Sequence, residues 1–376
     1  MTKKIGIVCY PTVGGSGVVA TELGIQLAEK NYEIHFISTT LPFRLKKLYP
    51  NIYYHEVEVA NYPVFKHPPY DLSLANKIAE VINREDLDII HAHYAIPHAI
   101  CAIFAKQMTK KDVKIVTTLH GTDITILGVD ESLHEMVRYA IDESDGVTAV
   151  SNSLREQTID VFQTNKPIEV IYNFIDPNDN KEKDHTIDLK QQFNIQSDEK
   201  VLIHISNFRK VKRVDDVVNV FKQVNEQIKS KLLLVGDGPE YKRIYKLVHQ
   251  LQIEDDVIFL GRQNNIHDLL SISDLMLLLS DKESFGLVLL EAMISGVPCI
   301  GTNVGGIPEV IQHGEDGFIC EVGQLDEITE KALLLLTDQQ LWSRFSNQAR
   351  HNATNKFHAN KIVAEYEKLY EKLLKD

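Results

Sequence analysis

Short apolar runs rich in β-branched residues alternate along the chain with helix-length segments that carry one apolar face. Strands buried on both faces read as short hydrophobic runs, so this alternation predicts β-α-β units and parallel sheets. The strands predicted in the first half are Ile5–Tyr10, Glu33–Ser38, Ile89–Ala92, Lys114–Leu119, Gly146–Val150 and Glu169–Ile171. Those predicted in the second half are Val201–Ile205, Lys231–Val235, Val257–Leu260, Leu275–Leu279, Pro298–Gly301 and Gly317–Cys320.

A polar stretch rich in Asp and Asn, residues 173–200, separates the two series of strands. This composition is typical of a linker, here leading into a surface helix. We therefore predict two doubly wound, Rossmann-like α/β domains, residues 1–172 and 173–357, with a final helix in residues 358–376 crossing back to the first domain. Facing domains of this kind would present the carboxyl ends of both sheets to one cleft, where such sheets bind ligands.

The composition and net charge of the chain limit the kinds of molecule that it is expected to bind. The 376 residues are 44% hydrophobic and 25% charged, as in ordinary soluble proteins, and the net charge of −13 argues against nucleic acid and anionic membranes as partners. No stretch approaches the roughly 20 apolar residues of a membrane helix, and the first apolar run is too short for a signal peptide. The four cysteines lie in apolar runs outside any CxxC pair, which indicates buried thiols in a reducing, cytoplasmic setting.

A glycine loop, Gly14–Gly17, joins the first strand to the first helix. Its amide groups suit an anion or a closely approaching ligand, but a simple tight turn explains the loop equally well. The pattern is not GxGxxG, and the second predicted strand does not end in an acidic residue. Both absences weaken an NAD-dependent dehydrogenase as an alternative.

Three histidines stand near the ends of predicted strands. We expect His91 to be a hydrogen-bonded structural residue, and we expect no metal site, because His91 and His93 lack a third well-spaced ligand. His120 follows an apolar strand and precedes Gly121, so we expect an exposed side chain with a functional role at the edge of the cleft.

The run Arg209–Arg213 holds four cations in five positions and follows the strand Val201–Ile205. A solvated face would explain a charge run, but this one falls at a carboxyl strand end, where cations can neutralise a diphosphate. The turn Val235–Pro239, which contains Gly236, also ends a strand and reads as structural by itself.

The most specific signal is Glu283-x7-Glu291. We expect Phe285-Gly286 to open a helix whose free amide groups point outward, with Glu291 about two turns along it. Glu291 has apolar neighbours, so we expect it to be half-buried and paired. Carboxylates accept hydrogen bonds from the vicinal hydroxyls of a ribose or hexose, which indicates a nucleotide-sugar site.

The segment ESFGLVLLEAM, followed by PCI and GG-x-PE, together with GGSG, HGTD and VGDGPE, resembles family 4 of the retaining GT-B glycosyltransferases over essentially the whole chain. PTVGGSGVVATELG, HAHYAIPHA and HISNFRKVKRVDD resemble the branch of that family that makes the first product of bacillithiol biosynthesis. The resemblance implies the GT-B fold, UDP-N-acetylglucosamine as donor, L-malate as acceptor, and neither a cofactor nor an essential metal.

The resemblance also implies roles for residues of this chain. Glu291 would hold the ribose, while Glu283 and the amides of Phe285, Gly286 and Leu287 would hold the hexose. His120 would contact the sugar near the reacting centre, and Lys212 would bind phosphate. Many members carry Arg where this chain has Asn207, and Arg209 could supply that charge. The remaining donor-site residues are Gly15, Ser16, Gly236, Gly261 and Arg262.

The residues expected around the acceptor are Ser16, Tyr94, Thr118 and Arg138, with Arg138 favoured because a dicarboxylate suits a forked donor. Without the resemblance, a dicarboxylate, a sugar phosphate such as inositol phosphate, and a neutral sugar all stay open as acceptors. Alternatives from other classes are a nucleotide-sugar 2-epimerase and a non-catalytic nucleotide-sugar sensor. The sequence is compatible with a homo-oligomer and does not define the oligomeric state.

Overall fold

A computed structural model describes residues 2–11, 14–45, 47–59, 66–176 and 186–375. The chain forms two compact units: unit 1 comprises Met1–Asn173 and Ala359–Asp376, and unit 2 comprises Phe174–His358. Most of the predicted linker, residues 177–185, lies outside the described residues.

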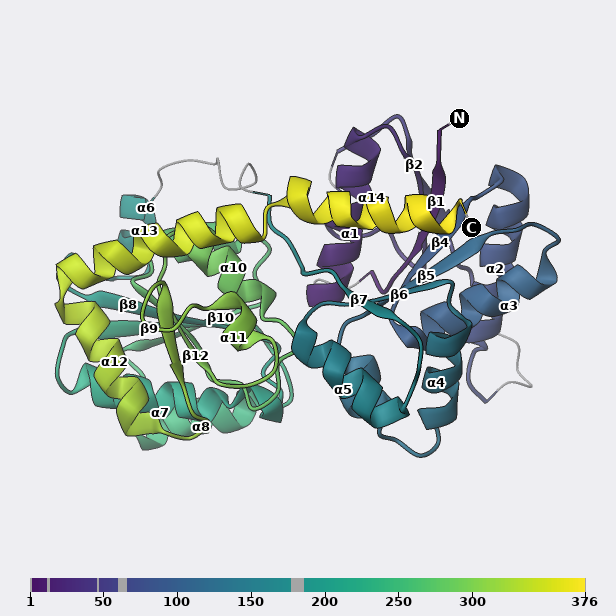
Figure 1. Cartoon of the computed structure of the whole chain (residues 1–376). Coiled ribbons are helices and arrows are strands. Elements are labelled where there is room, and N and C mark those ends of the chain that lie inside the picture. Colours follow the sequence, from purple (N-terminus) through teal and green to yellow (C-terminus); the bar gives the residue numbers. More distant parts are fainter. Residues whose placement is uncertain (1, 12–13, 46, 60–65, 177–185, 376) are drawn as a thin grey trace. The chain divides into compact units, whose positions relative to one another are not determined.

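Unit 1 is built on a parallel sheet with the strand order β3-β2-β1-β4-β5-β6-β7 (Figure 1). The strands are β1 Lys4–Val8, β2 Glu33–Ser38, β3 Ile52–Glu56, β4 Ile89–His93, β5 Lys114–Leu119, β6 Gly146–Ala149 and β7 Ile168–Val170. The helices are α1 Gly15–Glu29, α2 Tyr70–Glu85, α3 Ile100–Met108, α4 His134–Glu143, α5 Asn152–Phe162 and α14 Ala359–Leu373, with short helical segments η1 Ala95–Ala99 and η2 Asp123–Leu127.

Helices cover both faces of this sheet, which is why its central strands are apolar throughout. On one face, α2 and α3 pack on β1, β2, β4 and β5 in a continuous apolar cluster. On the other face, α1 approaches closely, because a side chain at Gly24 would come within 2.4 Å of the Phe36 ring. The predicted return of the last helix is confirmed, since α14 packs in unit 1 beside α1 and buries Tyr366 and Tyr370.

Unit 2 repeats the architecture with the strand order β10-β9-β8-β11-β12-β13 (Figure 1). The strands are β8 Lys200–Ile205, β9 Ser230–Val235, β10 Val257–Gly261, β11 Leu275–Leu278, β12 Cys299–Thr302 and β13 Gly317–Cys320. The helices are α6 Thr186–Gln192, η4 Lys210–Lys212, α7 Val214–Asn225, α8 Tyr241–Gln250, α9 Ile266–Ser271, α10 Leu287–Ile294, α11 Ile307–Val310, α12 Leu325–Thr337 and α13 Gln339–Lys356.

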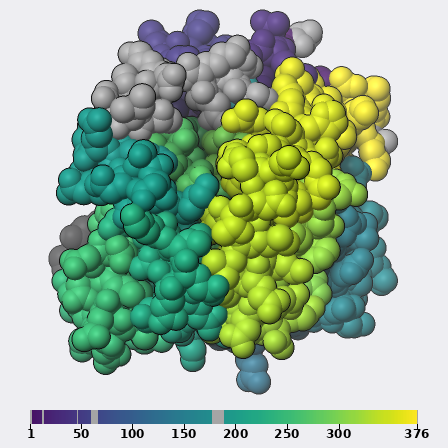
Figure 2. Space-filling model, turned by 90° about the vertical axis from the view of Figure 1, so that its left-hand side faces the viewer, coloured from purple at the N-terminus to yellow at the C-terminus, as the bar shows by residue number. Residues whose placement is uncertain are grey.

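One apolar core of unit 2 lies between the sheet and the helices α7, α8 and α12. In the space-filling view, the yellow-green surface of α12 and α13 adjoins the teal and green surface of the segments that follow Thr186 (Figure 2). The aromatic rings of Phe318 and Phe345 meet inside this unit with centroids 5.1 Å apart. This contact packs α13 against β13.

The predicted fold class is confirmed: both sheets are parallel, and both follow the order 3-2-1-4-5-6 of doubly wound domains, to which unit 1 adds a seventh strand, β7. The sequence prediction omitted β3, whose residues are only half-buried because it is the edge strand of unit 1. Its polar and aromatic pattern, IYYHE, lacks the apolar run that marks a central strand. In unit 1 the strands β1, β2 and β3 are added toward one edge of the sheet, and β4 to β7 are then added on the other side of β1. The switch point of this order lies between β1 and β4, and the switch point of unit 2 lies between β8 and β11. Ligands of such folds bind at the switch point.

Candidate functional site

The switch point of unit 2 brings two predicted residues into contact. Lys212 ends the η4 turn that follows β8, and Glu283 lies in the loop that follows β11. The Lys212 Nζ donates to Glu283 Oε2 at 2.5 Å, and the two side chains are only 17% and 15% exposed. A short charge-assisted contact of this kind at a carboxyl strand end forms a polar site with both signs of charge.

The loop that carries Glu283 is held on both sides by backbone hydrogen bonds. The Asp281 amide donates to the Val211 carbonyl at 2.9 Å, and the Gly306 amide donates to the Glu283 carbonyl at 3.0 Å. Gly305 has a φ of +53°, and a Cβ there would lie 1.8 Å from the Glu283 carbonyl oxygen. The position of Glu283 therefore depends on a close approach that only glycine allows.

The neighbouring loops meet through a second set of glycines. Gly236, at φ +125°, would place a Cβ 1.8 Å from the Ser206 carbonyl oxygen, and its amide donates to the Gly261 carbonyl at 2.7 Å. The loops after β8, β9 and β10 thus pack backbone against backbone. Asn207 and Arg262, both predicted donor residues, lie exposed on these loops.

The four cations of the basic run Arg209–Arg213 differ in their contacts. Arg213 caps α7 and pairs with Asp216 at 2.6 Å, so it belongs to the helix. Arg209 and Lys210 are exposed and, within the part of the chain that the structure describes, neither makes an ion pair. Two cations therefore stay available to a ligand near Lys212, which is itself engaged by Glu283.

The helix α10 carries the second carboxylate. It begins at Leu287, one residue after Gly286, whose φ of +90° sets the left-handed turn into the helix. Phe285 is buried against Phe357 with a centroid distance of 5.6 Å, which anchors this turn. Glu291 is 7% exposed, so this carboxylate is buried more deeply than the half-buried position expected from the sequence. The start of α10 lies one residue beyond the predicted opening.

At the switch point of unit 1, a buried carboxylate ties two loops together. Asp123 accepts hydrogen bonds from the Gly121 amide at 2.8 Å, the His120 amide at 3.3 Å and, through its other oxygen, the Ala95 amide at 3.2 Å. The loops after β4 and β5 are thereby held in one arrangement. Burial raises the pKa of the Asp123 carboxyl to about 6, against the lowering effect of these amides. The sequence analysis did not single out Asp123, although the HGTD motif contains it.

His120 lies in a stack of imidazoles. Its Nε2 is 2.9 Å from His93 Nδ1, and the His93 ring stacks on the His91 ring with centroids 4.5 Å apart. Burial lowers the pKa of His120 to about 3 and that of His91 to about 3 as well. These rings are therefore neutral at neutral pH, and His120 is half-buried rather than exposed as expected.

The expectation of a structural His91 is confirmed. His91 Nδ1 lies 2.7 Å from the Tyr370 hydroxyl of α14, and its Nε2 lies 2.7 Å from Thr118 Oγ1. Thr118 also contacts Thr148 at 2.7 Å and is fully buried. The Thr118 hydroxyl, predicted to contact the acceptor, is thus used within the core beneath α14.

Tyr94 follows β4 with a φ of +90° and is half-buried beside His120, with ring centroids 5.2 Å apart. Tyr10, which follows β1, joins this group: its ring lies 6.0 Å from Tyr94 and 4.4 Å from His98. The sequence analysis missed Tyr10, although its place after the first strand was a usable signal. Gly15 and Ser16 open α1 at the end of the same β1 loop, and residues 12–13 of that loop lie outside the described residues.

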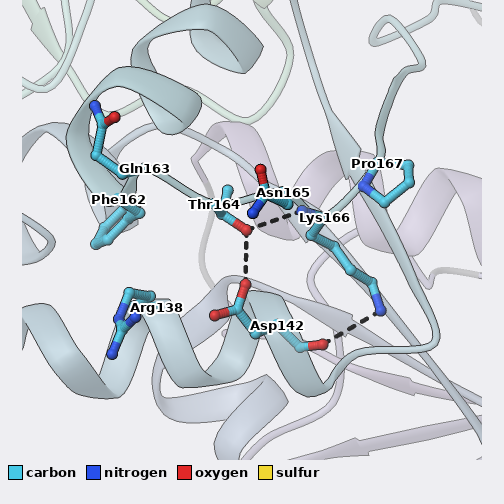
Figure 3. A pocket seen from close by; sticks show the side chains of 8 residues that line it. All are labelled: Arg138, Asp142, Phe162, Gln163, Thr164, Asn165, Lys166 and Pro167. Carbon is cyan, nitrogen blue, oxygen red and sulfur yellow. Dashed lines mark hydrogen bonds between the residues drawn. The ribbon is translucent and has the colours of Figure 1, made fainter.

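Arg138 lies on α4 and pairs with Glu135 at 2.7 Å. It lines an open pocket with Asp142 and the segment Phe162–Pro167 (Figure 3). In this pocket Thr164 Oγ1 donates to Asp142 at 2.6 Å. The helix α4 packs against η1, directly after Tyr94, and the Arg138 guanidinium donates two hydrogen bonds to Glu135 of its own helix.

The four cysteines are buried free thiols, as expected. Within the described residues, no helix is both long and apolar enough to cross a membrane.

Two protein-family models match the chain. The model described as Glycosyltransferase Family 4 matches residues 13–179, and the model described as Glycosyl transferases group 1 matches residues 186–352. Between them the two matches span most of both units.

Individual relatives extend over the full length. The N-acetyl-alpha-D-glucosaminyl L-malate synthase of Bacillus anthracis is 59% identical over 376 residues, covering 100% of this chain and 98% of that protein. An uncharacterized glycosyltransferase of Methanocaldococcus jannaschii is 27% identical, covering 96% and 95%. Among solved structures, the Anabaena HepE protein in complex with UDP-glucose aligns with a TM-score of 0.84 at 21% identity, covering 98% and 99% of the two chains, which shows a common fold.

Proposed function

The chain belongs to glycosyltransferase family 4, and on this premise we propose that it transfers N-acetylglucosamine from UDP-N-acetylglucosamine to the hydroxyl of L-malate, the first step of bacillithiol biosynthesis. The observation that carries the proposal is the 59% identity, over the full length, to the L-malate synthase of Bacillus anthracis. The polar site of Lys212 and Glu283 at the switch point of unit 2 supports it.

We assign the donor to unit 2. The buried carboxylate of Glu291 suits the two ribose hydroxyls, because a carboxylate can accept both hydrogen bonds. Glu283 and the amides at the start of α10 would hold the hexose. Lys212 and the exposed Arg209 would neutralise the diphosphate, with Asn207, Gly236, Gly261 and Arg262 on the loops around it.

We assign the acceptor to unit 1. Tyr94 and His120 lie together at the carboxyl ends of β4 and β5, and the start of α1 offers the amides of Gly15 and Ser16. Arg138 would pair with a malate carboxylate after exchanging its present partner, Glu135. Thr118 would act by supporting His91 and the strand end rather than by exposing its hydroxyl.

The reaction itself needs no nucleophile from the protein. The bond between the anomeric carbon and the diphosphate oxygen breaks, and the malate hydroxyl oxygen bonds to the same carbon on the same face. The hydroxyl proton passes to the departing phosphate oxygen, so UDP leaves with the electron pair and configuration is retained. The protein contributes orientation and stabilisation of the leaving charge by Lys212 and Arg209. We expect these cations to replace an essential metal.

We place the reaction in the cytoplasm, because four buried thiols without a disulfide suit a reducing compartment.

A UDP-release assay tests the proposal. UDP-N-acetylglucosamine is incubated with L-malate, inositol phosphate, glucose phosphate or no acceptor, and the product is analysed by NMR for its anomeric configuration. We expect release with L-malate and an α-linked product. Release with inositol phosphate but not malate would overturn the acceptor, an epimer from the donor alone would indicate an epimerase, and tight donor binding without product would indicate a sensor.

A further inference from the structure

A second polar cluster lies in unit 1, apart from the site described above. His35 of β2, His55 of β3 and Glu85 at the end of α2 each offer one ligand atom, and these atoms all lie within 4.8 Å of one another. We propose that His35, His55 and Glu85 bind a divalent transition-metal ion of the zinc type, which ties the edge strand β3 to β2 and α2.

The position of the cluster separates it from the proposed reaction. Glu85 ends α2 just before β4 begins, and its carbonyl accepts from the Lys4 ammonium at the start of β1 at 3.0 Å. The cluster therefore lies on the strands β2 and β3 at one edge of the sheet, beside the end of α2. Tyr94 and His120 follow the central strands β4 and β5 instead, and the α1 amino terminus follows β1. A metal here would act on the stability of the sheet edge and not on sugar transfer.

His35 is oriented as a metal ligand would be. Its Nε2 lies 3.1 Å from Glu33 Oε1, and Glu33 is itself paired with Lys4 at 3.0 Å. A carboxylate beside one ring nitrogen holds the proton there and leaves the lone pair of the other nitrogen for the metal. The other ring nitrogen of His35, Nδ1, lies 2.9 Å from His55 Nε2 and accepts its hydrogen bond in the absence of a metal. Tyr53 stacks on the His35 ring with centroids 4.9 Å apart and fixes its plane.

His55 and Glu85 become available once the Arg84 guanidinium moves away from them. Arg84 Nη2 lies 2.9 Å from His55 Nδ1, which places the His55 proton on Nε2, and Arg84 Nε pairs with Glu85 Oε1 at 2.6 Å. Arg84 also pairs with Glu80 at 2.8 Å, and its side chain is 51% exposed, so it can release both ligands while it stays paired with Glu80. The His55 proton then moves to Nδ1, and Nε2 binds the metal. The Arg84 guanidinium therefore competes with the ion for the ligand atoms.

The ligand types of the cluster favour one group of ions. Two imidazole nitrogens with one carboxylate suit zinc, cobalt or nickel, whereas magnesium and calcium prefer all-oxygen sites. Of these ions we commit to zinc, which takes three protein ligands and a water readily.

The test uses the full chain with any affinity tag removed. Zinc content after equilibrium dialysis should be one ion per chain, and cobalt should give the absorption bands of a four-coordinate site. His55→Gln and Glu85→Gln should each weaken zinc binding by about tenfold or more. Arg84→Met should strengthen it severalfold, because it removes the competing cation. Magnesium should not raise the thermal unfolding temperature, and zinc should.

His249→Gln is the matched control, because His249 pairs with Glu254 on the surface of unit 2 at 3.7 Å. It should leave zinc binding unchanged. Folding of each variant is checked by circular dichroism, and sugar transfer by the UDP-release assay should stay at the level of the unmodified chain. Zinc binding that is absent, or that survives both His55→Gln and Glu85→Gln, would overturn the metal site without affecting the proposed reaction.

Discussion

The Lys212 ammonium and the Glu283 carboxylate, 71 positions apart in the sequence, meet at 2.5 Å across the carboxyl ends of the paired strands β8 and β11. In the absence of a sugar donor, the ammonium and the carboxylate neutralise each other at a half-buried position. A bound diphosphate would draw Lys212 toward itself and leave Glu283 to accept hydroxyl hydrogen bonds. We therefore propose that donor binding exchanges the contact between Lys212 and Glu283 for contacts of each residue with the donor.

Lys212→Ala should lower kcat/KM by roughly 10²–10³-fold, because it removes a cation that stabilises the leaving diphosphate. The UDP-release assay measures this loss. Lys246→Ala is the matched control: Lys246 is an exposed lysine of α8 in the same unit, so its removal should cost less than about twofold. Near-normal turnover of Lys212→Ala would contradict the role of Lys212.

Gly305→Ala should reduce activity by about tenfold or more, because the new Cβ would lie 1.8 Å from the Glu283 carbonyl and must displace that loop. Gly314→Ala is the control. Gly314 also has a positive φ, +80°, but its Cβ would meet open space, so both variants share the backbone strain of about 1 kcal/mol. Equal activity of the two variants would show that the Glu283 loop does not depend on Gly305.

Asp123→Asn should lower kcat with a smaller effect on KM. The backbone N–H groups of Gly121 and Ala95 each donate to one oxygen of Asp123. An asparagine side chain has only one oxygen, so its NH2 group would face one of these donors, and the loop that carries His120 should shift. A positioning role predicts that the double variant with His120→Ala is no slower than His120→Ala alone. Additive losses would assign Asp123 a role independent of His120. Thermal unfolding separates this effect from lost stability.

Arg138→Ala should raise the KM for malate by roughly 10–100-fold and leave the KM for the donor nearly unchanged, because it removes a charge-assisted hydrogen-bond donor from the acceptor alone. Steady-state kinetics with each substrate varied measures both constants. Arg155→Ala, which removes a half-buried arginine of α5 that pairs with Glu156, should change neither. An equal rise in both constants would remove Arg138 from the acceptor site.

Stability should fall as the pH is lowered from about 6.5 to about 5. Burial depresses the folded-state pKa of several histidines, so unfolding takes up protons in this window and each contributes up to about 1.4 kcal/mol per pH unit. These are His91 and His120, at about 3, and His55, His98 and His204, at about 4. The pKa values of His35 and His93 are also lowered. The carboxyl of Asp123, whose pKa is raised to about 6, acts in the opposite sense, as do those of Asp316 and Glu365, whose pKa values are also raised.

Urea unfolding at several pH values measures this dependence. His204→Gln should reduce the slope by about one proton, because His204 is buried and hydrogen-bonded to the Leu277 carbonyl. A stability that rises toward acid would contradict the assignment of neutral, buried histidines.

The pattern of apolar residues along the chain was sufficient to predict the central strands of both sheets, but not the edge strand β3. The apolar runs of β1 and β8 predicted their strands because both faces of each are covered. The first strand is predicted as Ile5–Tyr10, whereas the structure has it at Lys4–Val8. Pairing with β2 begins at Lys4, and the hydrophobicity of a residue does not show where pairing begins. The half-buried β3 went unpredicted for the same reason, because edge strands are defined by pairing rather than by burial.

The sequence alone determined the two α/β units, the position of the carboxylates Glu283 and Glu291, and the structural role of His91, because these depend on periodicity and on neighbours along the chain. The tertiary structure alone decided that Lys212 pairs with Glu283, that Asp123 joins two loops, and that the Thr118 hydroxyl is used in the core. Each of these contacts joins loops or strands brought together by the order of strands in a sheet. Only folding sets that order, so a linear pattern does not contain it.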